Sequence, residues 1–429
     1  MKQKLKKQLI DLKNTGFFSI FLSSVFCKVL VFIGGTIIVR ILSKTDYGIY
    51  AYVLNCISML CIFNDFGATT AALQFLTEES DNVKKQGAIL KYCLKIIFYS
   101  AVFSSLLIFL SPLYYPFTIN GTKKYVLILG LLPVFTTLSN IFPVILRSNL
   151  DNKKYAKFQV FSTFTSYLLL IGLSLLFGLI GAIISQYIYN IILLLFGFYL
   201  AYSYIKKYDL KSNLDKREKK DFLKFSIASQ VNNSISGLLI IIDTFLIGLL
   251  IASSETVATY KVASSIPHAM TFISSCVAIY ITPFFVKNKK NLEWIREKYN
   301  KLLIYGIVGY GIICLILITF SKYIITFIYG KQYLDAVPIF IVLMIGLFFT
   351  STFKVPCANI IYSMRKVKIN LITNICSAIL NFISNIYFIN NYGIIGAAIT
   401  TTLINIIISV VYIIYLNNLL RRKKKDDNV

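Results

Sequence analysis

The feature that most constrains the fold of this chain is a series of apolar blocks, each about twenty residues long and separated from the next by a short polar gap. A helix of about twenty apolar residues is long enough to cross the roughly 30 Å hydrocarbon core of a bilayer. One such block is compatible with a buried core helix in a soluble protein, but a dozen are not. The pattern therefore predicts an all-α polytopic membrane protein with about twelve transmembrane helices, whose approximate spans are 16–39, 47–76, 88–110, 125–146, 158–177, 180–204, 222–250, 257–286, 302–321, 336–362, 369–389 and 393–416.

The distribution of basic residues indicates the orientation of these spans. The segments on the side of the two termini, which are the gaps together with the adjoining ends of the spans, hold 35 of the 44 Lys and Arg residues, and the gaps on the opposite side hold six. Because cytoplasmic loops carry an excess of Lys and Arg, both termini are predicted to be cytoplasmic. The net charge of +26 is thereby confined to short gaps, and this argues against a nucleic-acid partner, which requires a continuous basic face.

An internal repeat divides the chain into two halves. The segment GLIGAIISQYIYNII at 178–192 aligns without gaps with GIIGAAITTTLINII at 393–407, and both contain Gly-xx-Gly-Ala followed by Asn. Six spans per half is an even number, so the two copies are predicted to be parallel repeats, as in many alternating-access transporters. A duplicated scaffold without transport is the alternative. The predicted domains are two six-helix bundles joined by a hydrophilic cytoplasmic linker, and their boundaries are 1–205, 206–221 and 222–429.

Three short motifs connect the chain with a known family. RILSKTDYGIYAY at 40–52, NDFGATTAA at 64–72 and FIYGKQYLDAVPIF at 327–340 resemble the polysaccharide flippase family, which moves lipid-linked oligosaccharides such as O-antigen units. That family belongs to the MATE-like superfamily of multidrug, oligosaccharidyl-lipid and polysaccharide exporters. The resemblance covers most of the chain and implies a MATE-like fold.

The resemblance also implies a function and a location. The expected protein is a flippase of the bacterial cytoplasmic (inner) membrane that carries an undecaprenyl-diphosphate-linked oligosaccharide, an O-antigen or capsule repeat unit, to the outer face by alternating access. Its expected partners are this lipid-linked oligosaccharide, membrane lipids, a coupling H⁺ or Na⁺, and the polysaccharide polymerase machinery. Flippases of this kind have a cation-lined cavity whose wall includes the first, second, seventh and eighth helices.

Each half of the chain places one lysine and one aspartate on its first two predicted spans, which are equivalent in the repeat. These are Lys28 and Asp65 in the first half, and Asp243 and Lys261 in the second. An ionisable residue at membrane depth is a candidate functional residue, because it is costly unless it is paired or hydrated. In one interpretation the lysines bind the diphosphate of the substrate and the aspartates couple transport to an ion. In the other, the charges form buried ion pairs that only hold helices together.

Two further cations are candidate substrate contacts. Lys354 lies in the tenth span without an obvious acidic partner, so it either extends towards the cytoplasmic interface or points into the cavity. Arg40 lies at the outer end of the first span, where it either anchors the helix at the interface or contacts phosphate as an outer gate.

Two other classes of function share part of this pattern. A MATE-type cation-coupled multidrug exporter has the same architecture, but its cationic substrates require a net acidic cavity, whereas three lysines and two aspartates lie inside the spans. A membrane glycosyltransferase or polymerase requires acids, bases or a metal on an ordered external loop, and the short outer gaps contain no such cluster. The eight cysteines have no CxxC spacing. The sequence therefore predicts no enzymatic activity, no metal and no cofactor.

Overall fold

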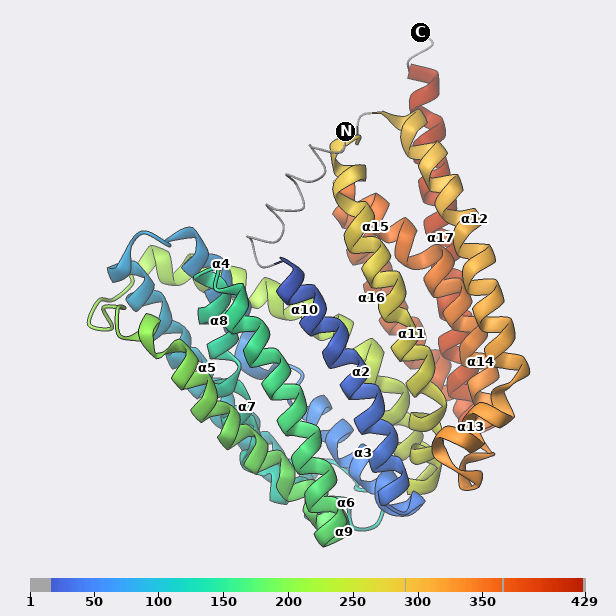
Figure 1. Cartoon of the computed structure of the whole chain (residues 1–429), viewed down its shortest axis with the longest axis horizontal. Helices are drawn as coiled ribbons and strands as arrows, with labels where there is room; N and C mark the ends of the chain where they lie inside the picture. Colours follow the sequence, from blue (N-terminus) through green and yellow to red (C-terminus); the bar gives the residue numbers. More distant parts are fainter. Residues whose placement is uncertain (1–16, 290, 365, 427–429) are drawn as a thin grey trace. The chain divides into compact units, whose positions relative to one another are not determined.

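The computed structural model describes residues 17–289, 291–364 and 366–426, and within these ranges every regular element is helical (Figure 1). The chain forms two compact units, unit 1 up to Gly237 and unit 2 from Leu238 onward. This division falls inside a helix, whereas the sequence suggested a boundary in the hydrophilic segment before it. The boundary between the two copies of the repeat, which the sequence places in that hydrophilic segment, stays a prediction.

Unit 1 consists of helices that pack around a core of aliphatic and aromatic side chains. Leu76, Leu90, Ile97 and Leu146 are fully buried in this core. The elements of unit 1 are α2 (Phe17–Ile41), α3 (Lys44–Leu60), the short helix η1 (Asn64–Gly67), α4 (Ala68–Glu78), α5 (Val83–Tyr114), α6 (Thr122–Ile128), η2 (Leu129–Leu131), α7 (Leu132–Ser139), α8 (Ile141–Ser148), α9 (Asn152–Ile205) and the first part of α10 (Lys216–Ile251).

Unit 2 has its own core, in which Tyr299, Ile360 and Leu416 are buried. Its elements are the remainder of α10, α11 (Ser254–Lys287), α12 (Leu292–Thr319), α13 (Ser321–Tyr329), η3 (Lys331–Tyr333), α14 (Ala336–Phe349), the π-helical turn η4 (Thr350–Lys354), α15 (Val355–Ser363), α16 (Val367–Tyr392) and α17 (Ile394–Asp426).

The helices account for the expected number of membrane spans. Ten helices within the described ranges are long and apolar enough to cross a membrane, and the bent pair of α3 with η1 and α4 adds an eleventh. Helix α9 has 54 residues, about 80 Å at 1.5 Å per residue, and is therefore too long for one span. Gly178 interrupts it with φ 58° and ψ −137°. Counting its two parts separately confirms the prediction of about twelve spans in an all-α polytopic membrane protein.

The second span is broken, although the sequence pattern predicted one continuous helix over 47–76. Helices α3 and α4 meet at an angle of 49°, and Asp65, Phe66 and Gly67 between them all have positive φ. The break leaves backbone carbonyls without helical partners, which is costly in a membrane unless other groups bind them. Helix α10 supplies those groups, because its hydroxyl and amide side chains at a spacing of four residues donate to the carbonyls of Ile62 and Phe66.

The donors on α10 form one stripe along the helix. Ser226 Oγ donates to the Phe66 carbonyl at 2.5 Å, while Gln230 Nε2 and Ser234 Oγ donate to the Ile62 carbonyl at 2.8 and 2.9 Å. Residues four apart lie on the same helix face, so α10 presents the whole stripe to the break. The backbones approach closely here, since a Cβ at position 67 would lie 2.2 Å from the Ser226 carbonyl oxygen.

The repeat found in the sequence is also a repeat of backbone geometry. Gly393, the counterpart of Gly178, has φ 61° and ψ −144° at the junction of α16 and α17. A Cβ at Gly181 would lie 1.9 Å from the carbonyl oxygen of Leu173, and a Cβ at its counterpart Gly396 would lie 2.0 Å from that of Phe388. The Gly-xx-Gly-Ala motif therefore encodes the same tight helix–helix turn in both units.

Replacing Gly181 with alanine is expected to lower the stability of the protein by about 1–3 kcal/mol, because the added methyl group overlaps backbone that cannot move aside cheaply. Gly172→Ala is a matched control in the same helix. No atom lies within 4 Å of a Cβ at position 172, so this change is expected to raise stability by up to about 1 kcal/mol through helix propensity. Thermal unfolding of the purified variants in detergent measures both effects, and equal shifts would contradict the steric explanation.

The hydrophilic segment between α9 and α10 packs against unit 1. Tyr208 and Leu214 are buried with the core side chains of that unit. The backbone N–H of Asp209 donates to the Val83 carbonyl at 3.4 Å. A Cβ at Gly87 would lie only 2.1 Å from the carbonyl oxygen of Asp209. The segment is therefore held by backbone contact as well as by buried side chains.

Candidate functional site

The candidate site is a buried carboxylate in unit 2. Asp243 lies on the part of α10 that belongs to this unit, and its side chain is among the buried polar groups. Its Oδ2 atom accepts hydrogen bonds from Tyr260 Oη on α11 at 2.7 Å and from Thr401 Oγ1 on α17 at 2.5 Å. Its Oδ1 atom accepts a hydrogen bond from Asn385 Nδ2 on α16 at 2.8 Å. Four helices thus converge on one acidic side chain.

The amide groups of α16 extend this cluster. Asn385 Nδ2 also donates to Asn381 Oδ1 at 2.9 Å, as the spacing of four residues on one helix face permits. Asn385 is completely buried, and its Oδ1 atom has no hydrogen-bond partner among the described residues. A buried acceptor without a donor is rare in folded proteins and calls for an explanation such as an ion. We refer to Asp243, Tyr260, Asn381, Asn385 and Thr401 as the Asp243 cluster.

Lys261 does not neutralise this carboxylate by direct contact. It follows Tyr260 on α11 and is half-buried, but the structure contains no salt bridge between Lys261 and Asp243. Adjacent residues on a helix point in different directions, so Tyr260 reaches the carboxylate and its neighbour does not. The donors to Asp243 are all neutral side chains. The ion-pair interpretation of these two residues is therefore not what the structure shows.

The corresponding pair in unit 1 is not formed either. Lys28 lies on α2 with an exposed side chain, and no salt bridge joins it to Asp65 within the described part of the chain. Asp65 instead accepts hydrogen bonds from the backbone N–H groups of Gly67 at 2.9 Å and Thr69 at 3.3 Å, and from the Thr69 hydroxyl. This carboxylate binds the free N–H groups at the start of α4, as a helix cap does.

The two units differ at the position of the Asp243 cluster. In unit 1, Tyr50 Oη accepts a hydrogen bond from Gln186 Nε2 at 3.0 Å. Gln186 is the repeat counterpart of Thr401, which binds the same carboxylate as Tyr260 in unit 2. In each unit a tyrosine lies at the helix that carries the repeat motif, α9 in unit 1 and α17 in unit 2. Only in unit 2 does a carboxylate lie between the tyrosine and that helix. The repeat therefore carries one charged site rather than two.

The other two predicted cations are Lys354 in unit 2 and Arg40 in unit 1. Lys354 ends the π-helical turn η4, and its Nζ donates to Asn405 Oδ1 at 3.0 Å. It is therefore bound inside unit 2 through a neutral partner. Arg40 lies in the last turn of α2, three residues before Ser43, whose hydroxyl caps α3 by accepting from the Asp46 N–H at 3.0 Å. The polar elbow of the first motif is thus a capped helix–helix turn.

Comparison with known proteins places this architecture in a family. The family described as polysaccharide biosynthesis protein matches residues 37–338, which is well over half of the chain. The chain belongs to this polysaccharide biosynthesis protein family. The similarity to that family inferred from the three motifs is confirmed.

This polysaccharide biosynthesis protein also has relatives over most of its length. The uncharacterized membrane protein MJ1375 of Methanocaldococcus jannaschii is 24% identical over 402 residues, covering 90% of this chain and 94% of that protein. Lipid II flippase MurJ aligns with a TM-score of 0.71 at 18% identity, covering 92% of this chain and 86% of that chain. A multidrug resistance MATE family transporter of the MOP superfamily aligns with a TM-score of 0.76 at 16% identity, covering 93% and 96%. The expected MATE-like fold is confirmed.

Sequence reasoning identified Asp243 in this polysaccharide biosynthesis protein but missed the groups that bind it. Tyr260 was overlooked beside the more conspicuous Lys261. Asn381 and Asn385 were available as a signal, because two amides four residues apart in an apolar span form a polar stripe. The described residues contain no group of three or more His, Cys, Asp or Glu that could hold a metal ion. The hydrogen-bond donors of the site are thus neutral, while the charge of Lys261 acts on Asp243 without a salt bridge between the two residues.

Proposed function

We propose that this protein is a flippase of the bacterial cytoplasmic membrane that translocates an undecaprenyl-diphosphate-linked oligosaccharide to the outer face. The substrate is an O-antigen or capsule repeat unit, and both chain termini lie in the cytoplasm. The family membership, the MATE-like fold and the basic side of the loops support this proposal. The observation that carries it is the Asp243 cluster, because a buried carboxylate with neutral partners in a membrane span is suited to coupling transport to an ion.

The chemistry of the cluster favours a monovalent cation. An ionised carboxylate away from water is strongly destabilised unless a positive charge compensates it. A proton on Asp243 would remove the charge. Na⁺ would instead bind the carboxylate together with the oxygen atoms of Asn381, Asn385 and Thr401, since hard cations prefer oxygen ligands. Both cases give the unpartnered Asn385 Oδ1 a role. It would accept a hydrogen bond from the protonated carboxyl group, or it would be a ligand of Na⁺.

Ion binding at this position acts on helix packing. Asp243, Tyr260, Asn385 and Thr401 come from α10, α11, α16 and α17, so a change in the charge of one carboxylate changes the hydrogen bonds between four helices. An ion shifts a conformational equilibrium only by the difference between its affinities for the two states. The cluster provides such a difference, because it can coordinate the ion only while the four helices hold these side chains together.

The lysines have a separate role in the proposal. Lys28 is exposed within a membrane span, and a lysine is a flexible point charge that can follow a phosphate group. We assign Lys28 and Lys261 to binding of the diphosphate, with Lys354 and Arg40 as further candidate contacts. These residues favour an anionic substrate over the organic cations of a multidrug exporter.

The experiment that tests this function is removal of the protein from cells that make the polysaccharide. Lipid-linked repeat units are expected to accumulate on the cytoplasmic face while surface polysaccharide disappears, because later assembly steps lose their substrate. Expression of the intact chain restores both. Normal surface polysaccharide together with increased sensitivity to cationic drugs would contradict the proposal and indicate a multidrug exporter.

A further inference from the structure

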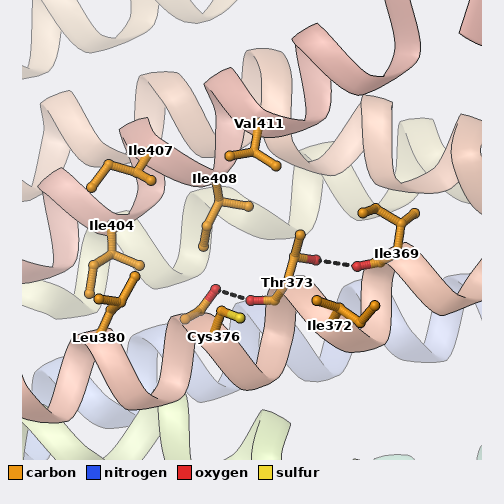
Figure 2. A pocket seen from close by; sticks show the side chains of 10 residues that line it. Ile369, Ile372, Thr373, Cys376, Leu380, Ile404, Ile407, Ile408 and Val411 are labelled. Carbon is orange, nitrogen blue, oxygen red and sulfur yellow. Dashed lines mark hydrogen bonds between the residues drawn. The ribbon is translucent and has the colours of Figure 1, made fainter. Parts of the chain in front are cut away.

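An apolar groove of about 260 Å³ runs between α16 and α17 in unit 2 (Figure 2). Thr373, Cys376 and Leu380 line it from α16, and Ile404, Ile408 and Val411 line it from α17. The groove is accessible, since Cys376 and Leu380 are exposed. Close packing normally removes a gap of this size between two neighbouring helices. Because the groove is open and apolar, it can hold the hydrocarbon chain of a lipid.

The shape of the groove follows from small side chains on one helix. Thr373 and Cys376 are short and lie about one turn apart on α16, opposite branched residues of α17 (Figure 2), and the short Ser377 also lines the groove. The two hydroxyl groups bind the helix itself, since Thr373 Oγ1 donates to the Ile369 carbonyl at 2.9 Å and Ser377 Oγ donates to the Thr373 carbonyl. With its polar atoms satisfied internally, the groove presents hydrocarbon to a ligand.

The length of the groove matches half of a bilayer. It extends along α16 from Ile369 to Leu380, about 16 Å at 1.5 Å per residue, against a hydrocarbon core of roughly 30 Å. Since a water molecule takes up roughly 30 Å³ and a methylene group is of similar size, the groove has room for about eight or nine carbon atoms of a chain. It is suited to a segment of a lipid tail within one leaflet.

One end of the groove is basic. Lys366 and Lys368 are exposed at the start of α16, just before the lining residue Ile369. Helices α16 and α17 are antiparallel, and a hydrogen bond of 2.6 Å between the hydroxyls of Thr373 and Tyr412 sets their register. This register brings the exposed Arg421 of α17 to the same end. Three cations therefore lie where the phosphate of a lipid in the groove would reach the interface.

The other end of the groove adjoins the Asp243 cluster. The lining residue Leu380 immediately precedes Asn381, and the lining residue Ile404 lies one turn after Thr401. The two helices that form the groove are thus two of the three that donate hydrogen bonds to the carboxylate from another part of the chain. A chain held between them fixes their separation next to the ion site.

We propose that this groove binds the polyprenyl tail of the lipid-linked substrate before translocation, while its diphosphate still lies at the interface beside Lys366, Lys368 and Arg421 and has not yet reached Lys28 and Lys261. The inference rests on the proposed function. Bulk phospholipid also has an apolar chain and a phosphate, but a groove that adjoins the ion site is suited to the substrate, because transport requires the ion site to respond to the substrate and not to the surrounding lipid.

The native thiol of Cys376 provides the test. The full chain is reconstituted into phosphatidylcholine vesicles, and the rate of alkylation of Cys376 by a lipid-soluble maleimide is measured by peptide mass spectrometry. Undecaprenyl diphosphate at about ten times its Kd is expected to slow this reaction about tenfold, because only the unoccupied groove reacts. Phosphatidylglycerol and inorganic diphosphate at the same concentration are expected to leave the rate unchanged.

Two variants serve as controls. Ile379→Cys places a thiol on the same helix at an exposed position outside the groove, and its alkylation is expected to be insensitive to the polyprenyl lipid. The double change Lys366→Glu with Lys368→Glu is expected to abolish protection of Cys376 by undecaprenyl diphosphate while the uncharged undecaprenol still protects it weakly. Together these controls separate tail binding from general shielding by the membrane.

Two results would overturn the inference. Unchanged alkylation with undecaprenyl diphosphate excludes tail binding in the groove, and equal protection by phosphatidylglycerol assigns the groove to bulk lipid. Neither result contradicts the proposed flippase function, provided that removal of the protein makes lipid-linked repeat units accumulate on the cytoplasmic face. Protection of Cys376 without any export defect in such cells would instead remove the proposed function.

Discussion

Replacing Asp243 with alanine is expected to abolish transport driven by an ion gradient. The change removes the only carboxylate of the Asp243 cluster and leaves the hydrogen-bond donors of Tyr260, Asn385 and Thr401 without their acceptor. Each buried donor left unpaired costs about 1–3 kcal/mol, so stability falls as well. Translocation of the lipid-linked oligosaccharide into proteoliposomes with an imposed Na⁺ or pH gradient measures the effect on transport.

Asp243→Asn separates loss of charge from loss of structure. The amide has the shape of the carboxylate, and its oxygen still accepts hydrogen bonds, so the variant is expected to fold while its transport no longer responds to the gradient. Asp65→Asn is the matched control in unit 1. Its side-chain oxygen can still cap α4, so coupling is expected to remain. Full gradient-driven transport by Asp243→Asn would show that the cluster is structural.

Replacing Gly67 with alanine is expected to have the largest effect on folding. The residue has φ +74°, where a side chain costs about 1–2 kcal/mol, and its Cβ would lie 2.2 Å from the Ser226 carbonyl oxygen and 3.1 Å from the Gln230 nitrogen. Both contacts are to the backbone of α10, which must shift away from the break. The combined loss of stability is expected to be about 2–4 kcal/mol.

Gly121→Ala is the control for this prediction. Gly121 also has a positive φ, of +82°, but only the Tyr125 ring lies within 4 Å of its added Cβ, at 3.9 Å. Its replacement therefore carries the backbone strain without the steric clash. Thermal unfolding in detergent is expected to show a clearly smaller decrease for this variant. Similar decreases for both would mean that the contact between α10 and the break adds nothing to stability.

The sequence predicted the features of this fold that are encoded locally. The length of each apolar block gave the spans, and the Gly-xx-Gly-Ala motif gave the repeat, because its first and second glycines meet a conformational and a steric requirement within one turn. The break in the second span was missed. Two of its three left-handed residues, Asp65 and Phe66, are not glycine, and the donors that stabilise it lie about 160 residues away on α10.

The candidate site was only partly predictable for the same reason. Asp243 could be found from the rule that an acid inside a membrane span has a function. Its partners could not, since Tyr260, Asn385 and Thr401 are 17, 142 and 158 residues away along the chain and meet it only after the helices of unit 2 have packed. The expected symmetry of two Lys–Asp pairs failed because Asp65 binds its own backbone and Lys261 lies beside a tyrosine that reaches the carboxylate first.

The packed segment between α9 and α10 has a practical consequence for fusion proteins. Its hydrophilic sequence makes it the obvious place to insert a reporter domain, yet Tyr208 and Leu214 are buried and Asp209 touches the backbone at Gly87. An inserted domain would have to pull these residues out of the core. The turn at Ser80 and Asp81 between α4 and α5 is exposed and has no such anchors, so a reporter placed there leaves the bundle intact.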